Sequence, residues 1–271
     1  MLQVQLIESL DLPELQPYRT MRRQMEHRQQ GIFVAEGEKV VRRLLESHLE
    51  VRSVLLPQKW FSELRPLLEA RSEQTRVYLA EKSLLETLTG FSMYQGLLAV
   101  GKVPPQPSLD HILGTTPGPH LFVAVDGLSS AENLGAVVRN CAAFGAHAII
   151  TGESCPSPFL RRAVRSSMGA IFHVPVIESE NLVRTLQHLR SNGIRCIAAH
   201  PHATGQTPAK TDFKPGCCIV LGSEGYGLAP ATLEACHQAA AVPMPQTVDS
   251  LNVASAAAVF LYEAHRQRAG L

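Results

Sequence analysis

The sequence predicts an α/β protein in which a mostly parallel sheet follows a smaller α/β domain. Beyond residue 120, short apolar runs alternate with helical patterns, which is typical of parallel strands buried on both faces. Six such runs predict strands at residues 121–126, 147–151, 171–176, 194–199, 217–222 and 240–244. Ligands of such sheets bind beyond the C-terminal ends of the strands, so we expect the functional site at that edge.

A proline-rich stretch divides the chain. Residues 102–119 carry five prolines and two glycines, a composition that excludes a long helix or an interior strand. We therefore predict a domain at residues 1–101, a linker at 102–119 and a second domain at 120–271. In the first domain, the patterns predict helices at 39–47 and 61–70 and strands at 51–56, 76–79 and 95–100.

The composition is that of a folded globular protein. Apolar residues make up 45% and charged residues 18% of the 271 residues, which argues against disorder. No apolar run reaches the roughly 18 residues of a membrane span, and the N-terminus lacks the pattern of a signal peptide. We therefore expect a cytoplasmic protein without a membrane partner. The six cysteines have no CxxC spacing, so we expect neither a disulfide framework nor a metal site.

One early segment is basic, although the net charge of the chain is only +1. Between residues 19 and 43, seven Lys and Arg side chains accompany three acidic ones. Such a segment can contact the phosphates of a nucleic acid, or it can form a solvated helix face. Charge alone leaves both interpretations open.

Three polar clusters follow predicted strand ends. The first begins at Asp126 and places Asn133 and Arg139 off the apolar stripe of a predicted helix. The second, LGSEGYGL at residues 221–228, is a loop whose three glycines let the backbone pass close to a ligand. It matches neither the dinucleotide-binding nor the phosphate-loop pattern. The third, DSLNVASAAA at residues 249–258, places polar side chains before a helix of small residues.

Each cluster also has a purely structural explanation. Asn133 would cap the first helix, and Ser250 or Asp249 would cap the last one. Glu224 would be a solvated loop acid. These alternatives stay open for each residue taken singly.

Taken in order, the three clusters resemble the motifs of the SpoU/TrmH-type RNA 2′-O-ribose methyltransferases of the SPOUT superfamily. The first motif, N-x-G-x-x-x-R with F-G downstream, is matched between residues 133 and 145. The second, L-G-x-E-G-x-G, is matched at residues 221–227, and the third, P-M followed by S-L-N-V, between residues 243 and 253. One departure is Gln246, where the family usually has glycine.

The resemblance implies an enzyme that transfers a methyl group from S-adenosylmethionine to a ribose 2′-hydroxyl. It implies that the C-terminal segment forms a deep trefoil knot around the cofactor and that the C-terminal domain forms a homodimer. The catalytic set that it implies is Asn133, Arg139, Glu224, Ser250 and Asn252. The cofactor contacts that it implies come from Ala199, Gly222, Val242, Met244 and Leu251. We expect Arg139 to bind the target phosphate rather than to act as a base, because a guanidinium stays protonated.

The resemblance extends to the first domain. Residues 33–47 resemble the RNA substrate-binding domain, akin to small ribosomal RNA-binding proteins, that some members carry. We therefore expect a structured RNA as partner, with 23S-type ribosomal RNA favoured over transfer RNA. The predicted RNA contacts are Arg22, Arg23, Arg28 and Arg165. Two other functions stay open, namely a catalytically silent RNA-binding module of the same fold and a small-molecule enzyme that binds a nucleotide.

Overall fold

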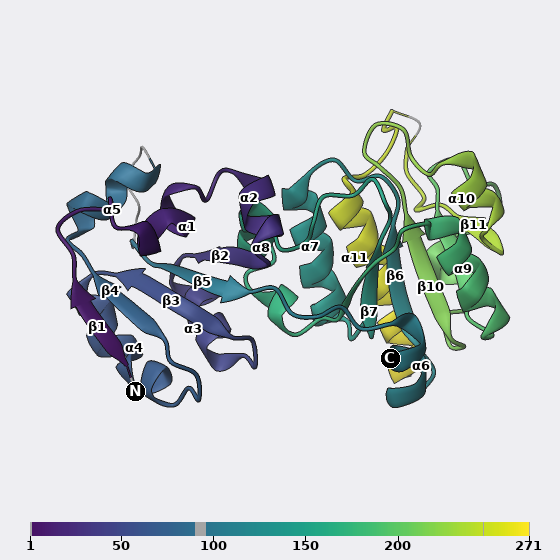
Figure 1. The fold of residues 1–271 in the computed structure, drawn as a ribbon. Helices are drawn as coiled ribbons and strands as arrows, with labels where there is room; N and C mark the ends of the chain where they lie inside the picture. The colour runs from purple at the N-terminus through teal and green to yellow at the C-terminus, as the bar shows by residue number, and fades with distance from the viewer. Residues whose placement is uncertain (1, 90–95, 246, 271) are drawn as a thin grey trace. The chain divides into compact units, whose positions relative to one another are not determined.

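A computed structural model describes residues 2–89, 96–245 and 247–270, and their contacts divide the chain into two compact units. Unit 1 comprises Met1–Pro105 and Phe159–His173, and unit 2 comprises Gln106–Pro158 and Val174–Leu271. Each unit has its own sheet (Figure 1). The chain therefore leaves unit 2 after Pro158 and returns to it at Val174.

Unit 1 is built on a five-stranded mixed sheet. Its elements are β1 (Gln3–Leu6), a 3₁₀ helix (Pro13–Leu15), α1 (Gln16–Arg19), α2 (Gln24–Gln29), β2 (Ile32–Glu36), α3 (Glu38–Glu46), β3 (Val51–Leu56), α4 (Gln58–Glu69), β4 (Arg76–Leu79), α5 (Lys82–Thr89), β5 (Leu98–Lys102), α8 (Arg161–Ser166) and a 3₁₀ helix (Ala170–Phe172). The strand order is β1-β4-β3-β5-β2, with β5 antiparallel to both of its neighbours and the other pairs parallel. The core of one face joins strand residues such as Val34 and Leu55 to Tyr18 of α1 and Leu85 of α5.

The segment Phe159–His173 packs into unit 1 through aromatic contacts. The ring centroid of Phe33 on β2 lies 5.4 Å from that of Phe159 and 5.5 Å from that of Phe172. A Cβ at Gly101 on β5 would lie 2.4 Å from the Phe33 ring, so only glycine leaves room for the ring. The strand expected at residues 171–176 was therefore wrong, because Phe172 belongs to a 3₁₀ helix and packs in the core of unit 1.

Unit 2 is built on a six-stranded, wholly parallel sheet in the order β11-β9-β10-β6-β7-β8. Its elements are α6 (Leu109–Thr115), β6 (Leu121–Val125), α7 (Ala131–Ala143), β7 (Ala148–Thr151), β8 (Val176–Glu178), α9 (Leu182–Ser191), β9 (Arg195–Ala199), a 3₁₀ helix (Pro208–Lys210), β10 (Cys217–Leu221), α10 (Pro230–Glu234), β11 (Gln238–Ala240) and α11 (Val253–Ala269). The α/β class and the parallel sheet expected from the apolar runs are confirmed.

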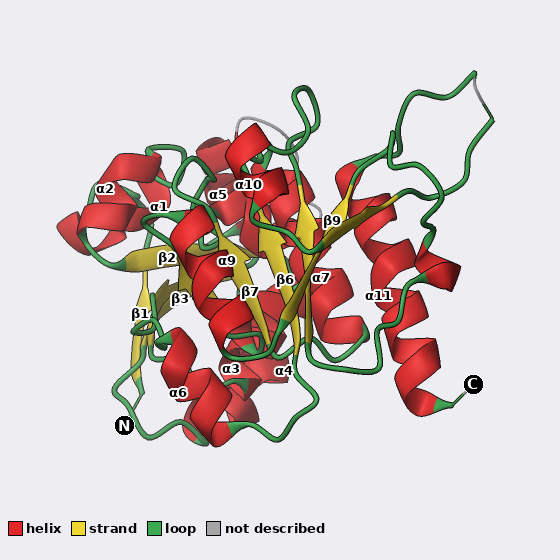
Figure 2. Ribbon diagram, turned by 90° about the vertical axis from the view of Figure 1, so that its right-hand side faces the viewer, coloured by secondary structure: helices red, strands yellow, loops and turns green. Residues whose placement is uncertain are grey.

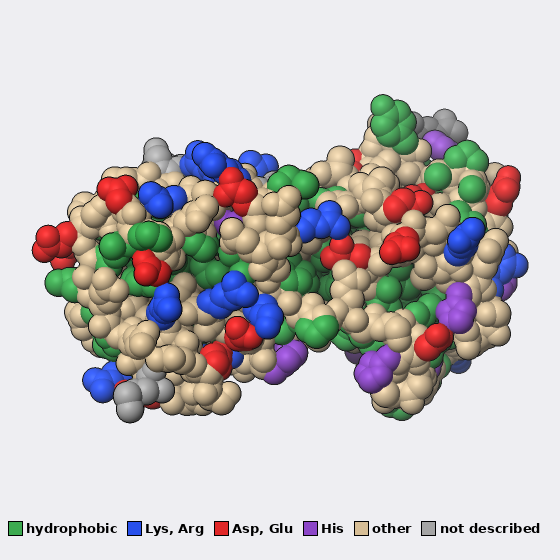
Figure 3. Space-filling model, in the orientation of Figure 1, with side chains coloured by type: hydrophobic (Ala, Val, Ile, Leu, Met, Phe, Trp, Pro, Cys, Tyr) green, Lys and Arg blue, Asp and Glu red, His purple; other side chains and the backbone are tan. Residues whose placement is uncertain are grey.

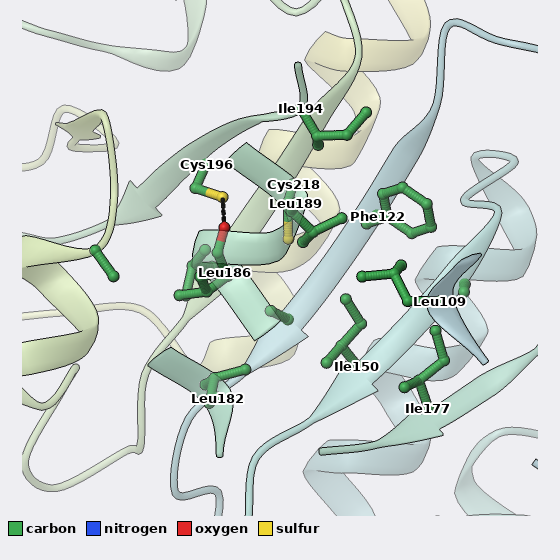
Figure 4. Close-up of a cluster of buried hydrophobic side chains, with 14 of the residues drawn as sticks. Leu109, Phe122, Ile150, Ile177, Leu182, Leu186, Leu189, Ile194, Cys196 and Cys218 are labelled. Carbon is green, nitrogen blue, oxygen red and sulfur yellow. Dashed lines mark hydrogen bonds between the residues drawn. The ribbon is translucent and has the colours of Figure 1, made fainter. Parts of the chain in front are cut away.

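Helices cover both faces of this sheet. α6, α9 and α10 lie on one face, and α7 and α11 lie on the other (Figure 2). The core under α6 and α9 joins Leu109, Leu186 and Leu189 to Phe122 and Cys218 of the sheet (Figure 4). Because β6, β7 and β10 are buried on both faces, their sequences are nearly continuous apolar runs.

The stretch expected as a linker contains α6. The Ser108 side chain caps this helix by accepting a hydrogen bond from the His111 N–H at 3.1 Å, and Leu109 and Ile112 join the core. The last strand also differs from the expectation of 240–244, because β11 ends at Ala240 and Pro243 has no N–H to donate to a neighbouring strand. None of the helices in the described ranges is both long enough and apolar enough to cross a membrane.

Candidate active site

A cavity of about 330 Å³ opens at the C-terminal edge of the sheet in unit 2. The ends of β9, β10 and β11 contribute Ala199, Gly222 and Ala240 to its wall, and the segment before α11 contributes Asp249, Ser250 and Leu251. Apolar side chains of α11, including Val253 and Phe260, close it from one side. The cavity therefore lies where parallel strands present their ligand-binding edge.

The glycine-rich loop after β10 is fixed by its own backbone. Ser223 and Gly227 exchange two backbone hydrogen bonds, with N···O distances of 2.9 Å and 3.0 Å. A Cβ on Gly222 would lie 2.3 Å from the carbonyl carbon of Gly227 and 2.4 Å from the nitrogen of Leu228. Residue 222 must therefore be glycine for the loop to fold back on itself. Asp126, at the end of β6, accepts a hydrogen bond from the Ala229 N–H at 3.0 Å and holds the end of the loop.

A side-chain network joins the three polar clusters. Asn252 Nδ2 donates to Asn133 Oδ1 at 3.1 Å, and Asn133 Nδ2 donates to Glu224 Oε1 at 2.6 Å. The three residues come from the start of α11, the first turn of α7 and the glycine-rich loop. The structure therefore brings together side chains that are separated by up to 119 residues.

The N-caps of α7 and α11 are not the residues that the structural explanations of the polar clusters proposed. Ser130 caps α7, because its Oγ accepts a hydrogen bond from the Asn133 N–H at 3.2 Å. Asn252 caps α11, because its Oδ1 accepts from the Ala254 N–H at 2.9 Å. The capping explanations of Asn133, Ser250 and Asp249 were therefore wrong, and only Asn252 serves both as a cap and as a network member.

The small residues of α11 let it pack closely on α7. Ala257 and Ala264 are fully buried on the packed side of α11. Asn140 lies seven residues after Asn133, on the same face of α7, and its Nδ2 donates to the Ala254 carbonyl at 2.7 Å. Sequence reasoning missed Asn140, although the spacing of seven residues from Asn133 was a usable signal.

The remaining predicted residues fall into two groups. All five predicted cofactor contacts line the cavity, and so do Glu224 and Ser250. Arg139 is exposed on α7 and has no hydrogen-bond or ion-pair partner within the described ranges.

Gln246 lies outside the described residues, so its effect on the loop stays a prediction. No group of three or more His, Cys, Asp and Glu side chains in the described part of the chain is arranged to hold a metal ion.

The four predicted RNA-contacting arginines belong to unit 1. Arg22, Arg23 and Arg28 are exposed in α2 and in the turn before it, and basic side chains gather on this face over α1 and α2 (Figure 3). Arg23 also pairs with Glu26 at 3.0 Å. Arg165 lies on α8, 3.4 Å from the buried carboxylate of Glu36.

Residues 120–262 match the SpoU rRNA Methylase family, which is more than half of the chain. The chain belongs to the SpoU rRNA methylase family. This SpoU methylase is 34% identical over 203 residues to the 23S rRNA (guanosine-2′-O-)-methyltransferase RlmB of Ralstonia nicotianae, with 74% of this chain and 81% of the relative covered. It is 32% identical over 248 residues to an uncharacterized tRNA/rRNA methyltransferase of Mycobacterium bovis, with 89% of this chain and 82% of the relative covered.

Solved structures of methyltransferases have the same fold. The SpoU methyltransferase AviRb from Streptomyces viridochromogenes is 26% identical with a TM-score of 0.82, covering 96% of this SpoU methylase and 98% of AviRb. The AdoMet-bound rRNA methyltransferase from Sinorhizobium meliloti matches with a TM-score of 0.83, and the match covers 97% of this chain and 98% of that enzyme. At 24% identity, this second likeness establishes the fold alone.

Some cavity-lining residues were not among the predicted site residues. His200, His202 and Tyr226 line the cavity together with Phe260. The two histidines follow β9 directly, and their place at a strand end was the available signal. Tyr226 lies at one of the two variable positions of the second motif, so the motif itself gave no reason to choose it.

Proposed function

We propose that this SpoU methylase transfers a methyl group from S-adenosylmethionine to a ribose 2′-hydroxyl of 23S-type ribosomal RNA. Relatives named for this reaction align with about three quarters of the chain at about a third identity, which supports the proposal. The observation that carries it in this chain is the hydrogen-bonded series Asn252, Asn133 and Glu224 beside the cavity.

The cavity fits the cofactor in size and in lining. Its volume of about 330 Å³ is at the lower end of the range for small-molecule sites, about 300–1,000 Å³. Its wall combines the loop backbone at Gly222 with the apolar side chains of Val242, Met244 and Leu251, while Ala199 lies at the end of β9. These five residues would hold S-adenosylmethionine, which when bound supplies a methyl group on a sulfonium sulfur.

The roles of the polar residues follow from what each can do. The reaction needs the 2′-oxygen held about 3 Å from the methyl carbon, in line, and it needs removal of the hydroxyl proton. Asn252 and Asn133 orient Glu224 by donating along the network, which leaves Glu224 Oε2 as an acceptor. Arg139, with its fixed fork of donors, binds the phosphate of the target nucleotide. Ser250 lies at the cavity wall where the ribose approaches.

We also propose the finer architecture of the family for this chain, with a deep trefoil knot made by the C-terminal segment. The start of α11 is hydrogen-bonded to Asn140 of α7, and Arg268 near its end is hydrogen-bonded to the residues directly before β6. Arg268 donates to the carbonyls of Pro119 at 2.7 Å and His120 at 2.9 Å. These hydrogen bonds at both ends of α11 support the proposal that the C-terminal segment passes through a loop of the chain.

We also propose how the protein assembles and which part of the chain carries each function. Val259 and Tyr262 of α11 are 38% and 54% exposed, which supports a homodimer formed through this helix. A ribosomal RNA substrate implies that the protein acts in the cytoplasm. We assign RNA binding to residues 1–101 together with Phe159–His173, which pack in the same unit. We assign methyl transfer to the rest of residues 120–271 together with α6, which lies in the stretch 102–119 and joins the core of unit 2. The exposed arginines of α2 and of the turn before it support the first assignment.

The function is tested by mapping 2′-O-methyl groups in total RNA from cells with and without the protein. We expect one ribosomal RNA position to lose its resistance to alkaline cleavage when the protein is absent. The purified protein, incubated with methyl-tritiated S-adenosylmethionine, should label ribosomal RNA transcripts and not transfer RNA. Labelling of transfer RNA alone would transfer the assignment to that substrate. Binding of S-adenosylmethionine without labelling of any RNA would indicate a silent module.

A further inference from the structure

Tyr226 projects into solvent from the tip of the glycine-rich loop. Its exposed fraction is 99%, the highest of the large apolar side chains in the described part of the chain. Water contact over a whole aromatic ring forgoes the burial that such rings usually obtain. A fully exposed ring next to a ligand cavity therefore suggests a surface that a ligand covers.

The loop holds this ring in a defined place. The Tyr226 N–H donates to Ser223 Oγ at 3.1 Å, within the loop closed by the Ser223 and Gly227 backbone pair. Gly225 and Gly227 flank the tyrosine, so neither neighbour has a side chain to cover its ring. Gly227 also takes a φ of 68°, which other residues adopt with difficulty. The ring is thus presented by a short, internally bonded loop.

The position of the loop relates the ring to the target nucleotide. Tyr226 lines the same cavity as Gly222 and Ser250, and Glu224, two residues before it, belongs to the network. In a nucleotide, the base is attached to C1′ and the 2′-oxygen to the adjacent C2′. A group that fixes the base therefore also restricts where the 2′-oxygen can lie.

The chemistry of the loop favours a base over a phosphate. Residues 221–228 contain no Lys or Arg, and their one charged side chain is the acid Glu224. A phosphate would be repelled by this carboxylate, whereas the face of a nucleobase is uncharged and stacks on aromatic rings. Such stacking is sequence-tolerant, because every base has a π-face.

We propose that Tyr226 is the stacking platform for a base of the RNA substrate, at the target nucleotide or directly beside it. This inference rests on the proposed function, because it assumes that the ribose of that RNA reaches the cavity. Tyr226 binds and positions the substrate; the phenol oxygen has no part in the chemistry. The ring alone is required, so phenylalanine should replace tyrosine and leucine should not.

The test compares Tyr226→Phe with Tyr226→Leu in steady-state methylation of a ribosomal RNA transcript. We expect Tyr226→Leu to raise KM for RNA at least about fivefold, the lower end of what one base–aromatic stack contributes, and Tyr226→Phe to stay within about twofold of the wild type. The Kd for S-adenosylmethionine and the Tm should not change in either variant. Equal KM values for the two variants, with an active wild type, would overturn the proposal.

A binding measurement separates this proposal from the proposed function. The chain has one tryptophan, Trp60, so Tyr226→Trp in a Trp60→Phe background carries a single reporter in the loop. Stacking predicts quenching of its fluorescence by RNA, even if no RNA is methylated. No quenching by an RNA that the protein binds would overturn the proposal. A dimer that dissociates in Tyr226→Leu would overturn it as well, since a second copy of the chain would then be what covers the ring.

Discussion

Replacement of Asn133 by alanine removes the central member of the site network. The variant loses the 2.6 Å hydrogen bond to Glu224 and the 3.1 Å hydrogen bond from Asn252. Because Glu224 and Asn252 are exposed, water replaces both partners, and we expect the free energy of unfolding to fall by less than about 1 kcal/mol. Turnover depends on where the Glu224 carboxylate points. We therefore expect kcat to fall at least about tenfold, or about 1.4 kcal/mol of transition-state stabilisation.

The matched control for Asn133→Ala is Asn140→Ala. Asn140 lies on the same face of α7 and also contributes a hydrogen bond to the C-terminal segment, at 2.7 Å to the Ala254 carbonyl, but it is outside the network. Tritium incorporation and thermal unfolding of both variants separate the two roles. We expect similar Tm changes and a loss of turnover for Asn133→Ala alone. Near-normal turnover of Asn133→Ala, or an equal loss in both variants, would refute the catalytic role of the network.

Three further predictions concern the loop, the start of α11 and the N-terminal edge of the sheet. Gly222→Ala should abolish S-adenosylmethionine binding in calorimetry, because its Cβ would overlap the backbone at Gly227. Gly225→Ala should bind normally, because its Cβ would meet no other part of the chain within 4 Å, and equal affinities of the two variants would contradict this prediction. Ser250→Asp should keep its Tm and lose turnover, because it adds a carboxylate where RNA phosphates approach, and retained turnover would remove Ser250 from the site. Burial, and then the nearby His120, lower the pKa of His147 below its usual 6.5. As pH falls below about 6.5, His147 is therefore protonated in the unfolded chain before it is protonated in the folded chain. The free energy of unfolding that neutral His147 contributes is lost over this range. The Tm of His147→Asn should therefore fall less than that of the wild type between pH 7.5 and 5.5, and parallel profiles would exclude the effect.

The sequence predicted several strands closely, although it missed β2 (Ile32–Glu36), which is buried at every position. β3 and β4 have the expected bounds, and β10 differs by one residue from 217–222, because most residues of these strands are apolar and buried. β1 was missed because its four residues, Gln3–Leu6, are all exposed at the sheet edge and carry no burial signal. The run at 171–176 is apolar for a different reason, since Phe172 belongs to the core of the other unit. Periodicity reports that a residue is buried and not in which core.

The site could be predicted only as far as the motifs reached. The five residues that the resemblance predicted as cofactor contacts all line the cavity, and the cavity lies at the C-terminal edge of the sheet, where parallel sheets bind ligands. The capping roles were misassigned because Ser130 and Asn252 are equally good caps, and only the helix starts decide between candidates. The network could not be derived, because hydrogen bonds between loops depend on tertiary approach. Tyr226 was missed because exposure has no signature in the sequence.

The assignment of RNA binding to unit 1 must account for Phe159–His173, which follow β7 in the chain and yet pack in unit 1. Phe159 and Phe172 pack on Phe33, and the buried carboxylate of Glu36 pairs with Arg161. A chain truncated before residue 120 would keep Phe159, Phe172 and Arg161 and lose their partners. Exposure of each phenylalanine would cost about 1.5–3 kcal/mol, a large share of the stability of a domain. Loss of methylation in such a truncation would therefore mix a loss of RNA binding with a loss of folding. Charge reversal of the exposed arginines in α2 and in the turn before it leaves that core intact, so it is the perturbation that separates recognition from stability.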